Sequence, residues 1–177
     1  MKHILCIVFI LLTLQPTDKY CLADVVSHAQ YHDMIRTVSR ETGLEAKVIM
    51  AVIKQESNWD PLAVSSSGAL GLMQVMPESA EEVGIPGSNL FDPYLNTLAG
   101  SRYLIKMYEQ FSNWGEALAA YYMGPGRFEK KELKKEHWRN LSRYLRAIRG
   151  HMKNYERFQA QLDGAKNQES TVPKLKT

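Results

Sequence analysis

Glu56 is the residue of this sequence best suited to acid–base chemistry. It follows an apolar run, and at 100° per residue it shares one helical face with Ile49, Val52 and Ile53. Apolar surroundings and the negative end of the helix dipole both disfavour the charged form of a carboxyl group. We therefore expect a raised pKa, and a value of about 6 would suit a general acid near neutral pH. Periodicity alone leaves a second interpretation open, because a glutamate in the last turn of a helix is often simply solvated.

Two further segments could form the walls of a ligand-binding cleft. Residues 65–77 (SSSGALGLMQVMP) contain two glycines three positions apart, which let the backbone turn sharply and approach a ligand. Residues 119–126 (AAYYMGPG) place two tyrosines directly before a helix stop. Each segment alone is more typical of a structural element, and the glycine spacing is not that of a phosphate-binding loop.

The elements that must position these residues are predicted to be mainly α-helices. Apolar residues recur every three or four positions, with Gly and Pro between the runs. The pattern predicts helices at 27–42, 45–57, 95–111 and 113–123, a short helix from Pro77 to Gly84, and a long helix from about Trp138. In the long helix the arginines take faces other than the apolar stripe, which must pack on the rest of the domain.

Composition and charge narrow the classes of protein further. The chain has 177 residues, of which 45% are hydrophobic and 23% charged, as expected for one globular domain. A net charge of +3 without an accompanying motif predicts no nucleic-acid partner. Charge is uneven, however: residues 24–100 hold 4 basic and 10 acidic side chains, and residues 101–177 hold 16 basic and 8 acidic.

The first 23 residues are typical of a secretory signal peptide. Lys2 and His3 precede an apolar stretch from Ile4 to Leu14, which is too short to cross roughly 30 Å of hydrocarbon, and residues 21–23 (CLA) suit a signal peptidase. We therefore expect an exported protein with no stable membrane span after cleavage. Both cysteines lie in the removed part, so no disulfide is expected.

The mature chain is expected to hold one domain at 24–163 and a flexible tail at 164–177, where the helical period ends. His28 and His32 stand four residues apart, but no metal-binding signature accompanies them. The sequence therefore predicts neither a metal nor another cofactor.

Taken in order, these segments resemble the soluble-type lytic transglycosylases, or SLT domains, whose fold is related to that of goose-type lysozyme. The resemblance covers about residues 30–160 and rests on four ordered motifs. These are Glu56-Ser57; Gly71-Leu72-Met73-Gln74 followed by Met76-Pro77; Ala120-Tyr121 with Gly124-Pro125-Gly126; and Tyr144 on the long helix. It implies a mainly α, lysozyme-like α+β fold with a small irregular β element after the catalytic helix.

The resemblance also implies a reaction and roles for single residues. Enzymes of this family cleave the β-1,4 bond between N-acetylmuramic acid and N-acetylglucosamine in peptidoglycan glycan strands, leaving a 1,6-anhydro end, so the protein would act in the periplasm or cell wall. Glu56 would serve as general acid and then as base, with Ser65 and Tyr144 in supporting roles. The remaining residues, expected to bind the saccharide, are Ser57, Met73, Gln74 and Tyr121.

Two other functions stay open at this point. A muramidase would hydrolyse the same bond, and a non-catalytic adaptor would bind peptidoglycan within a wall-spanning complex. Tyr122 stands where the family usually has Asn, and Met123 replaces a commonly small residue, which is what suggests the adaptor. The basic half of the chain could then contact a partner in an envelope machine.

Overall fold

The computed structural model describes residues 22–129 and 134–171, with side chains described for 30–129 and 134–160. Residues 1–21 of the predicted signal segment and 172–177 of the predicted tail therefore lie outside the described residues. The chain divides into two compact units, one made of His32–Met152 and the other of the two chain ends, Met1–Tyr31 and Lys153–Thr177. All the candidate site residues belong to the unit His32–Met152.

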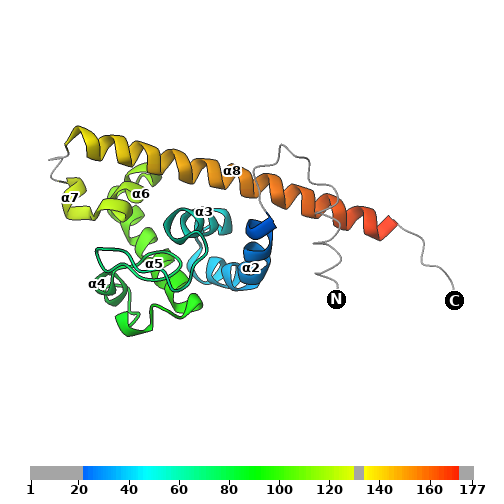
Figure 1. The fold of residues 1–177 in the computed structure, drawn as a ribbon, viewed down its shortest axis with the longest axis horizontal. Coiled ribbons are helices and arrows are strands. Elements are labelled where there is room, and N and C mark those ends of the chain that lie inside the picture. The colour runs from blue at the N-terminus through cyan, green and yellow to red at the C-terminus, as the bar shows by residue number, and fades with distance from the viewer. Residues whose placement is uncertain (1–21, 130–133, 172–177) are drawn as a thin grey trace. The chain divides into compact units, whose positions relative to one another are not determined.

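Helices form nearly all of the regular structure in the described residues (Figure 1). They are α2 (Leu22–Thr42), α3 (Ala46–Ser57), α4 (Pro77–Glu81), the 3-10 helix η1 (Gly87–Asn89), α5 (Pro93–Phe111), α6 (Trp114–Met123), α7 (Pro125–Glu129) and α8 (Lys135–Thr171). The mainly helical prediction is confirmed, and the predicted bounds of α3, α5 and α6 differ by at most two residues from those observed. Helices α2 and α8 each contribute residues to both units.

Helix α3 is the buried centre of the His32–Met152 unit. Its residues from Val48 to Ile53 are all buried, so the middle of this helix is surrounded by the core, while its polar residues lie at the two ends. It ends where Asn58 and Trp59 adopt left-handed backbone conformations, with φ of 52° and 72°. Glu56 therefore lies in the last turn of a helix that the core holds firmly.

A small β element follows α3, as predicted. It consists of two isolated antiparallel bridges, Val64 with Leu70 and Leu70 with Val75. Leu70 and Val75 exchange two backbone hydrogen bonds of 3.0 Å each. Gly71 turns the chain between them with φ of +71°, and a Cβ atom there would collide with the Asn96 side chain and the Leu90 carbonyl.

Helix α5 anchors this β element. Asn96 is fully buried; its Oδ1 accepts a hydrogen bond from the Met73 N–H at 2.8 Å, and its Nδ2 donates to the carbonyls of Leu70 and Leu90 at 2.7 and 2.8 Å. Gly100, one turn further along α5, leaves room for the Met73 side chain, because a Cβ there would lie 2.7 Å from the Met73 Cβ and Sδ. The loop that carries Gln74 is thus fixed to α5 by polar and apolar contacts.

Helix α6 packs against α5 and leads into α7 (Figure 1). Asn113 caps the start of α6, since its side chain accepts a hydrogen bond from the Glu116 N–H at 3.1 Å. Gly124, with φ of +86°, ends α6, and Pro125 opens the five-residue helix α7. The sequence did not predict α7, because five residues are too few to show a helical period.

Helix α8 continues to Thr171, beyond residue 163 where its apolar period ends. Six of the twelve residues 160–171 are Ala, Gln, Lys or Glu, which favour a helix, and this segment has no apolar stripe. The boundary at 163 and the flexibility of the tail stay predictions. Within the part of the chain that the structure describes, no helix is long and apolar enough to cross a membrane.

Candidate active site

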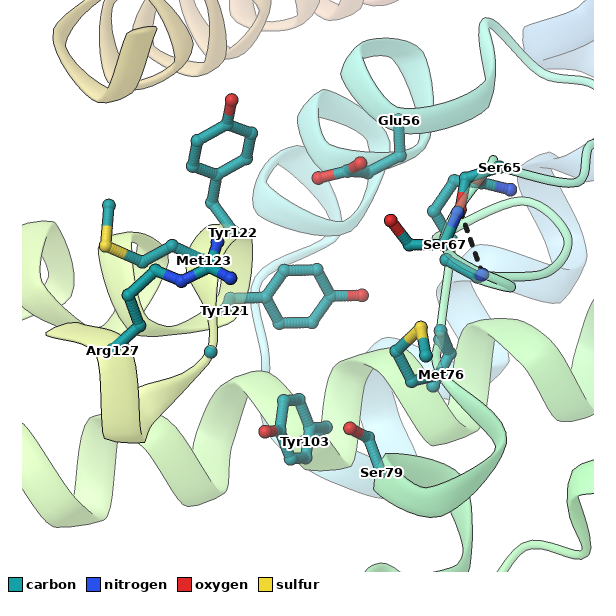
Figure 2. Close-up of a pocket in the computed structure, with 14 residues that line it drawn as sticks. Glu56, Ser65, Ser67, Met76, Ser79, Tyr103, Tyr121, Tyr122, Met123 and Arg127 are labelled. Atoms are coloured by element: carbon teal, nitrogen blue, oxygen red, sulfur yellow. Dashed lines mark hydrogen bonds between the residues drawn. The ribbon is translucent and has the colours of Figure 1, made fainter. Parts of the chain in front are cut away.

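A cleft of about 520 Å³ opens in the His32–Met152 unit, with the carboxyl group of Glu56 in its wall (Figure 2). Its walls come from the end of α3, the β element, α4, α5, α6 and α7. The lining residues are Glu56, Ser65, Ser67, Ala69, Gln74, Val75, Met76, Ser79, Tyr103, Tyr121, Tyr122, Met123, Gly124 and Arg127. Among the described residues that line this cleft, Glu56 is the only one with a carboxyl group.

The Glu56 carboxyl group is held by one strong hydrogen bond. The hydroxyl of Tyr144, from α8, donates to Glu56 Oε1 at 2.7 Å. Tyr144 is itself buried, with 4% of its surface exposed. Burial raises the pKa of the Tyr144 hydroxyl well above its usual value, and the neighbouring charge of Glu56 adds to the effect, so Tyr144 stays protonated and remains a donor.

Burial also decides the protonation of Glu56. Desolvation raises its pKa from 4.5 to about 7, although the hydrogen bond from Tyr144 acts in the opposite direction by favouring the carboxylate. The effect of the apolar surroundings, predicted from the sequence, is therefore the main cause of the raised pKa of Glu56. A pKa of about 7 lets the same group give and take a proton near neutral pH.

Ser65 and Gln74 line the wall formed by the β element, and Figure 2 shows Ser65 on the other side of Glu56 from Tyr122. The Ser65 Oγ accepts hydrogen bonds from the backbone N–H groups of Ala69 at 2.9 Å and Ser67 at 3.3 Å, which fixes its orientation. The Gln74 side-chain amide donates to the carbonyls of Ala63 and Gly71, both at 3.0 Å. Both predicted residues thus reach the cleft while also holding the loop in shape.

Tyr121 forms the floor of the cleft and links two of its walls. Its hydroxyl donates to the Met73 carbonyl at 2.7 Å, which ties α6 to the β element. Its ring lies 5.9 Å from that of Tyr103 on α5, at 57°. Figure 2 shows the Tyr121 hydroxyl directed toward the side of the cleft that carries Ser67 and Met76.

Two residues predicted to contact the saccharide do not line the cleft. Met73 is fully buried against α5, where the Ser101 hydroxyl lies 3.9 Å from its sulfur. Ser57 donates its hydroxyl to the Ile53 carbonyl at 3.2 Å, within α3. Their positions beside Gln74 and Glu56 in the sequence suggested contact, but helix and loop geometry turns both side chains away.

Other lining residues were not predicted. Tyr103 and Ser79 come from helices to which the sequence analysis assigned no site residue, and Arg127 lies in α7, the helix that was not predicted. Arg127 also lines a second cavity of about 190 Å³, together with Tyr122, Met123, His137 and Asn140. The only sequence signal for Arg127 was its place directly after the Gly-Pro-Gly turn.

No group of three or more His, Cys, Asp or Glu side chains that could hold a metal ion occurs among the described residues. The chemistry that the described lining offers is therefore that of one protonatable carboxyl group, a tyrosine donor and a set of hydroxyl and amide groups around an open cleft. This is the equipment of an acid–base site for an extended polar substrate.

The fold and the site together define a lysozyme-like, mainly helical domain with one buried acidic residue beside its cleft. The family model for the Transglycosylase SLT domain matches residues 33–142. The chain belongs to this family.

Individual relatives agree with the family. The chain is 38% identical to the soluble lytic murein transglycosylase of Escherichia coli K12 over 106 residues, which cover 55% of this chain and 16% of that protein. It is 42% identical to the membrane-bound lytic murein transglycosylase C of Salmonella arizonae over 84 residues, which cover 42% of this chain and 23% of that protein. The match thus spans less than a quarter of the length of either relative.

Solved structures share the fold. The lytic transglycosylase Slt of Pseudomonas aeruginosa, solved as an inactive glutamate-to-glutamine mutant, superimposes with a TM-score of 0.63 and 27% identity, covering 78% of this chain and 28% of that one. The 70 kDa soluble lytic transglycosylase of Escherichia coli gives a TM-score of 0.52 with 31% identity, covering 75% of this chain and 24% of that one.

Proposed function

We propose that this protein is an exported lytic transglycosylase that cleaves the β-1,4 bond between N-acetylmuramic acid and N-acetylglucosamine in peptidoglycan and leaves a 1,6-anhydro end. The observation that carries the proposal is the buried Glu56 carboxyl group beside the cleft, with a pKa of about 7 and a hydrogen bond from Tyr144. Glu56 would act first as general acid and then as general base.

In the first step, protonated Glu56 gives its proton to the glycosidic oxygen, and the bond from that oxygen to the anomeric carbon breaks. A large fraction of the group still carries this proton near neutral pH, because burial has raised its pKa. Glu56 is left as a carboxylate, and the hydrogen bond from Tyr144, which favours the charged form, then stabilises it.

In the second step, the Glu56 carboxylate takes the proton of the muramic 6-hydroxyl as this oxygen attacks the anomeric carbon. No water is consumed, and the product is the 1,6-anhydro sugar. The substrate's 2-acetamido group would stabilise the developing positive charge, as the resemblance implies. Ser65, whose oxygen is fixed by two backbone N–H groups, would bind near the reacting atoms.

The lining of the cleft favours this route over hydrolysis by a pair of carboxylates. Retaining and inverting glycosidases use a second carboxylate, about 5 to 9.5 Å from the first. The Asp60 side chain instead accepts a hydrogen bond from the Leu62 N–H in a turn at 2.9 Å, and Glu82 is paired with Lys106 at 2.8 Å. Neither lines the cleft.

The relatives support the same assignment. Replacing one glutamate by glutamine gives the inactive Pseudomonas aeruginosa enzyme, and we assign the equivalent dependence in this chain to Glu56. Export rests on the signal-like residues 1–23, and action on murein would place the protein in the periplasm or cell wall. A partner in an envelope machine stays a prediction from the basic half of the sequence.

The test is to digest purified peptidoglycan sacculi with the chain from Asp24 onward and to weigh the released muropeptides. We expect 1,6-anhydro products, each one water lighter than a muramidase product. Glu56→Gln should abolish release while leaving the circular dichroism spectrum unchanged, and Glu109→Gln, an exposed residue of α5, serves as the matched control. Hydrated products would identify a muramidase, and binding without release by the unmodified chain would identify an adaptor.

Binding of bulgecin A gives an independent check. The 70-kDa soluble lytic transglycosylase has been solved in complex with bulgecin A. If the cleft is the active site, bulgecin A should compete with glycan strands for this chain. Competition should persist in Glu56→Gln, since this variant keeps the shape of the cleft.

A further inference from the structure

Tyr122 has an environment that the mechanism above does not use. Its ring stacks on that of Tyr144, with centroids 4.4 Å apart and planes at 25°. Tyr144 in turn donates to Glu56, so the two contacts form a chain from Tyr122 to the reacting carboxyl group. Tyr122 is 43% exposed and lines the cleft, whereas Tyr144 is 4% exposed. Tyr122 therefore covers the donor of the catalytic hydrogen bond on its solvent side.

We propose that Tyr122 is a positioning residue, whose ring holds Tyr144 against Glu56 and keeps water away from this pair. The effect of Tyr122 on turnover rests on the proposed function. The stacking of Tyr122 on Tyr144 and the hydrogen bond to Glu56 do not depend on that function. A flat ring stacked on Tyr144 blocks the sideways swing of that side chain about its Cα–Cβ bond, which is the motion that would carry the hydroxyl away from Glu56. Asparagine, the usual residue of the family here, has no ring to do this.

The direction of the effect on Glu56 follows from the two influences on its pKa. Desolvation raises the pKa and is the larger influence, and the hydrogen bond from Tyr144 lowers it. Removing the Tyr122 ring would admit water to the pair, which weakens both, and the larger one decides. The pKa of Glu56 should therefore fall toward its ordinary value when the ring is removed.

The other titratable groups around Glu56 stay the same when Tyr122 is replaced. They are Tyr103 from α5, Tyr121 from α6, Arg127 from α7 and Tyr144 from α8; His137 of α8 lines the neighbouring cavity. Arg127 is the only one of them that is charged at neutral pH in its ordinary state, and none is altered by a substitution at 122. A change in the titration of Glu56 would then report the loss of cover rather than the loss of a charge.

The experiment compares Tyr122→Phe, which keeps the ring, with Tyr122→Asn, which removes it. The Glu56 carboxyl carbon is titrated by NMR in the chain from Asp24 onward, and its signal is assigned by its absence in Glu56→Gln. We expect the titration midpoint of Glu56 in Tyr122→Phe to equal that of the unmodified protein. In Tyr122→Asn the midpoint should fall by about half to one pH unit. On sacculi, kcat of Tyr122→Asn should fall about tenfold with KM changed less than twofold.

Tyr108→Asn is the matched control, because Tyr108 is also a partly exposed tyrosine stacked on an aromatic ring, that of Trp114 at 4.2 Å and 19°, and it does not line the cleft. It should leave the Glu56 titration unchanged. An unchanged midpoint in a folded Tyr122→Asn would overturn the proposal, as would a midpoint that rises. A raised KM with an unchanged titration would also overturn it, by assigning the ring to substrate contact.

The titration needs no turnover, so the two proposals fail separately. If the unmodified chain releases no anhydro products, the proposed function is wrong, and the midpoint in Tyr122→Asn still decides whether Tyr122 positions the pair. If the products form but the midpoint does not move, only the role of Tyr122 is wrong.

Discussion

Two opposite influences, burial and a hydrogen bond, set the protonation of Glu56. Burial raises the pKa of Glu56 to about 7, and the 2.7 Å hydrogen bond from Tyr144 pulls it down. A carboxyl group that must give and then regain a proton benefits from both, since the first favours the acid and the second favours the carboxylate. Tyr144→Phe removes the hydrogen bond and Tyr122→Asn reduces the burial, so these two substitutions should move the pKa of Glu56 in opposite directions.

Tyr144→Phe removes the hydrogen bond and keeps the ring. The pKa of Glu56 should then rise, because the contact that favours its charged form is lost while its burial remains. In the pH profile of kcat/KM on glycan strands, the fall on the alkaline side should move up by about half to one pH unit. We expect kcat to drop about tenfold, as the base of the second step loses its orienting partner. A fall that moves down, or stays, would contradict this role for Tyr144.

The burial of Glu56 should also affect the free energy of unfolding, and Glu56→Gln tests this effect. The folded state holds the Glu56 proton more tightly than the unfolded chain, so the contribution of this residue is complete below pH 4.5 and is lost as the pH rises through about 7. Glutamine carries no charge and can still accept from Tyr144. The variant should therefore match the unmodified chain at pH 4 and exceed its free energy of unfolding by about 3 kcal/mol at pH 8.5.

Urea unfolding at the two pH values measures this difference directly. Glu109→Gln replaces an exposed glutamate of α5 and should give the same free energy of unfolding as the unmodified chain at both pH values, within about 0.5 kcal/mol. Equal stabilities of Glu56→Gln and the unmodified chain at pH 8.5 would show that Glu56 is solvated.

At the scale of elements, the site depends on how the β element is attached to α5. Asn96 satisfies the Met73 N–H and the carbonyls of Leu70 and Leu90 in a fully buried position. The Met73 N–H and the Leu90 carbonyl are buried with this side chain, so losing it leaves each with a desolvation cost. The polar attachment of this wall to α5 therefore depends on one amide group.

Asn96→Ala should lower the free energy of unfolding by about 3 kcal/mol, since it leaves the Met73 N–H and the Leu90 carbonyl without their Asn96 partner in the core, while the Leu70 carbonyl keeps the hydrogen bond from the Val75 N–H. Thermal and urea unfolding measure the loss. Asn89→Ala removes an exposed asparagine of η1 and should cost less than about 0.5 kcal/mol. A loss below about 1 kcal/mol for Asn96→Ala would mean that the loop has other anchors.

The contrast between predicted and unpredicted elements has a physical origin. Long helices show their period in the sequence, and α3 showed that Glu56 shares a face with buried Ile49 and Ile53. The short helix α7 has no such period, which is why Arg127 was missed. Met73 and Gln74 are neighbours in one motif, yet one is buried and the other lines the cleft, because Gln74 adopts φ of 48° in a turn that periodicity does not describe.

Contacts between residues far apart in sequence were also beyond single-sequence reasoning. The resemblance placed Tyr144 near the reacting atoms, but 88 positions separate it from Glu56, and only the packing of α8 shows that its hydroxyl reaches the carboxyl group. The stacking of Tyr122 on Tyr144 is equally invisible in the sequence, where Tyr122 stood out only as a departure from the family.

At the scale of the whole molecule, the site belongs to one compact unit and the chain ends belong to the other. Every described side chain that lines the cleft lies within His32–Met152. Helix α8 continues past this unit, and its residue Phe158 is buried, with 4% of its surface exposed. The apolar period of α8 ends soon after Phe158, which is why we place the end of the domain at residue 163.

Two truncations test this boundary. A chain of residues 24–163 should keep the free energy of unfolding within about 0.5 kcal/mol and the release of muropeptides within about twofold, because it keeps every buried apolar side chain of α8 that the structure describes. A chain of residues 24–152 loses Phe158 and should be less stable by about 3 kcal/mol, the typical cost of removing a buried aromatic ring. If the two truncated chains are equally stable, the domain ends before Phe158; if the longer one is also destabilised, residues 164–177 belong to the fold and are not a tail.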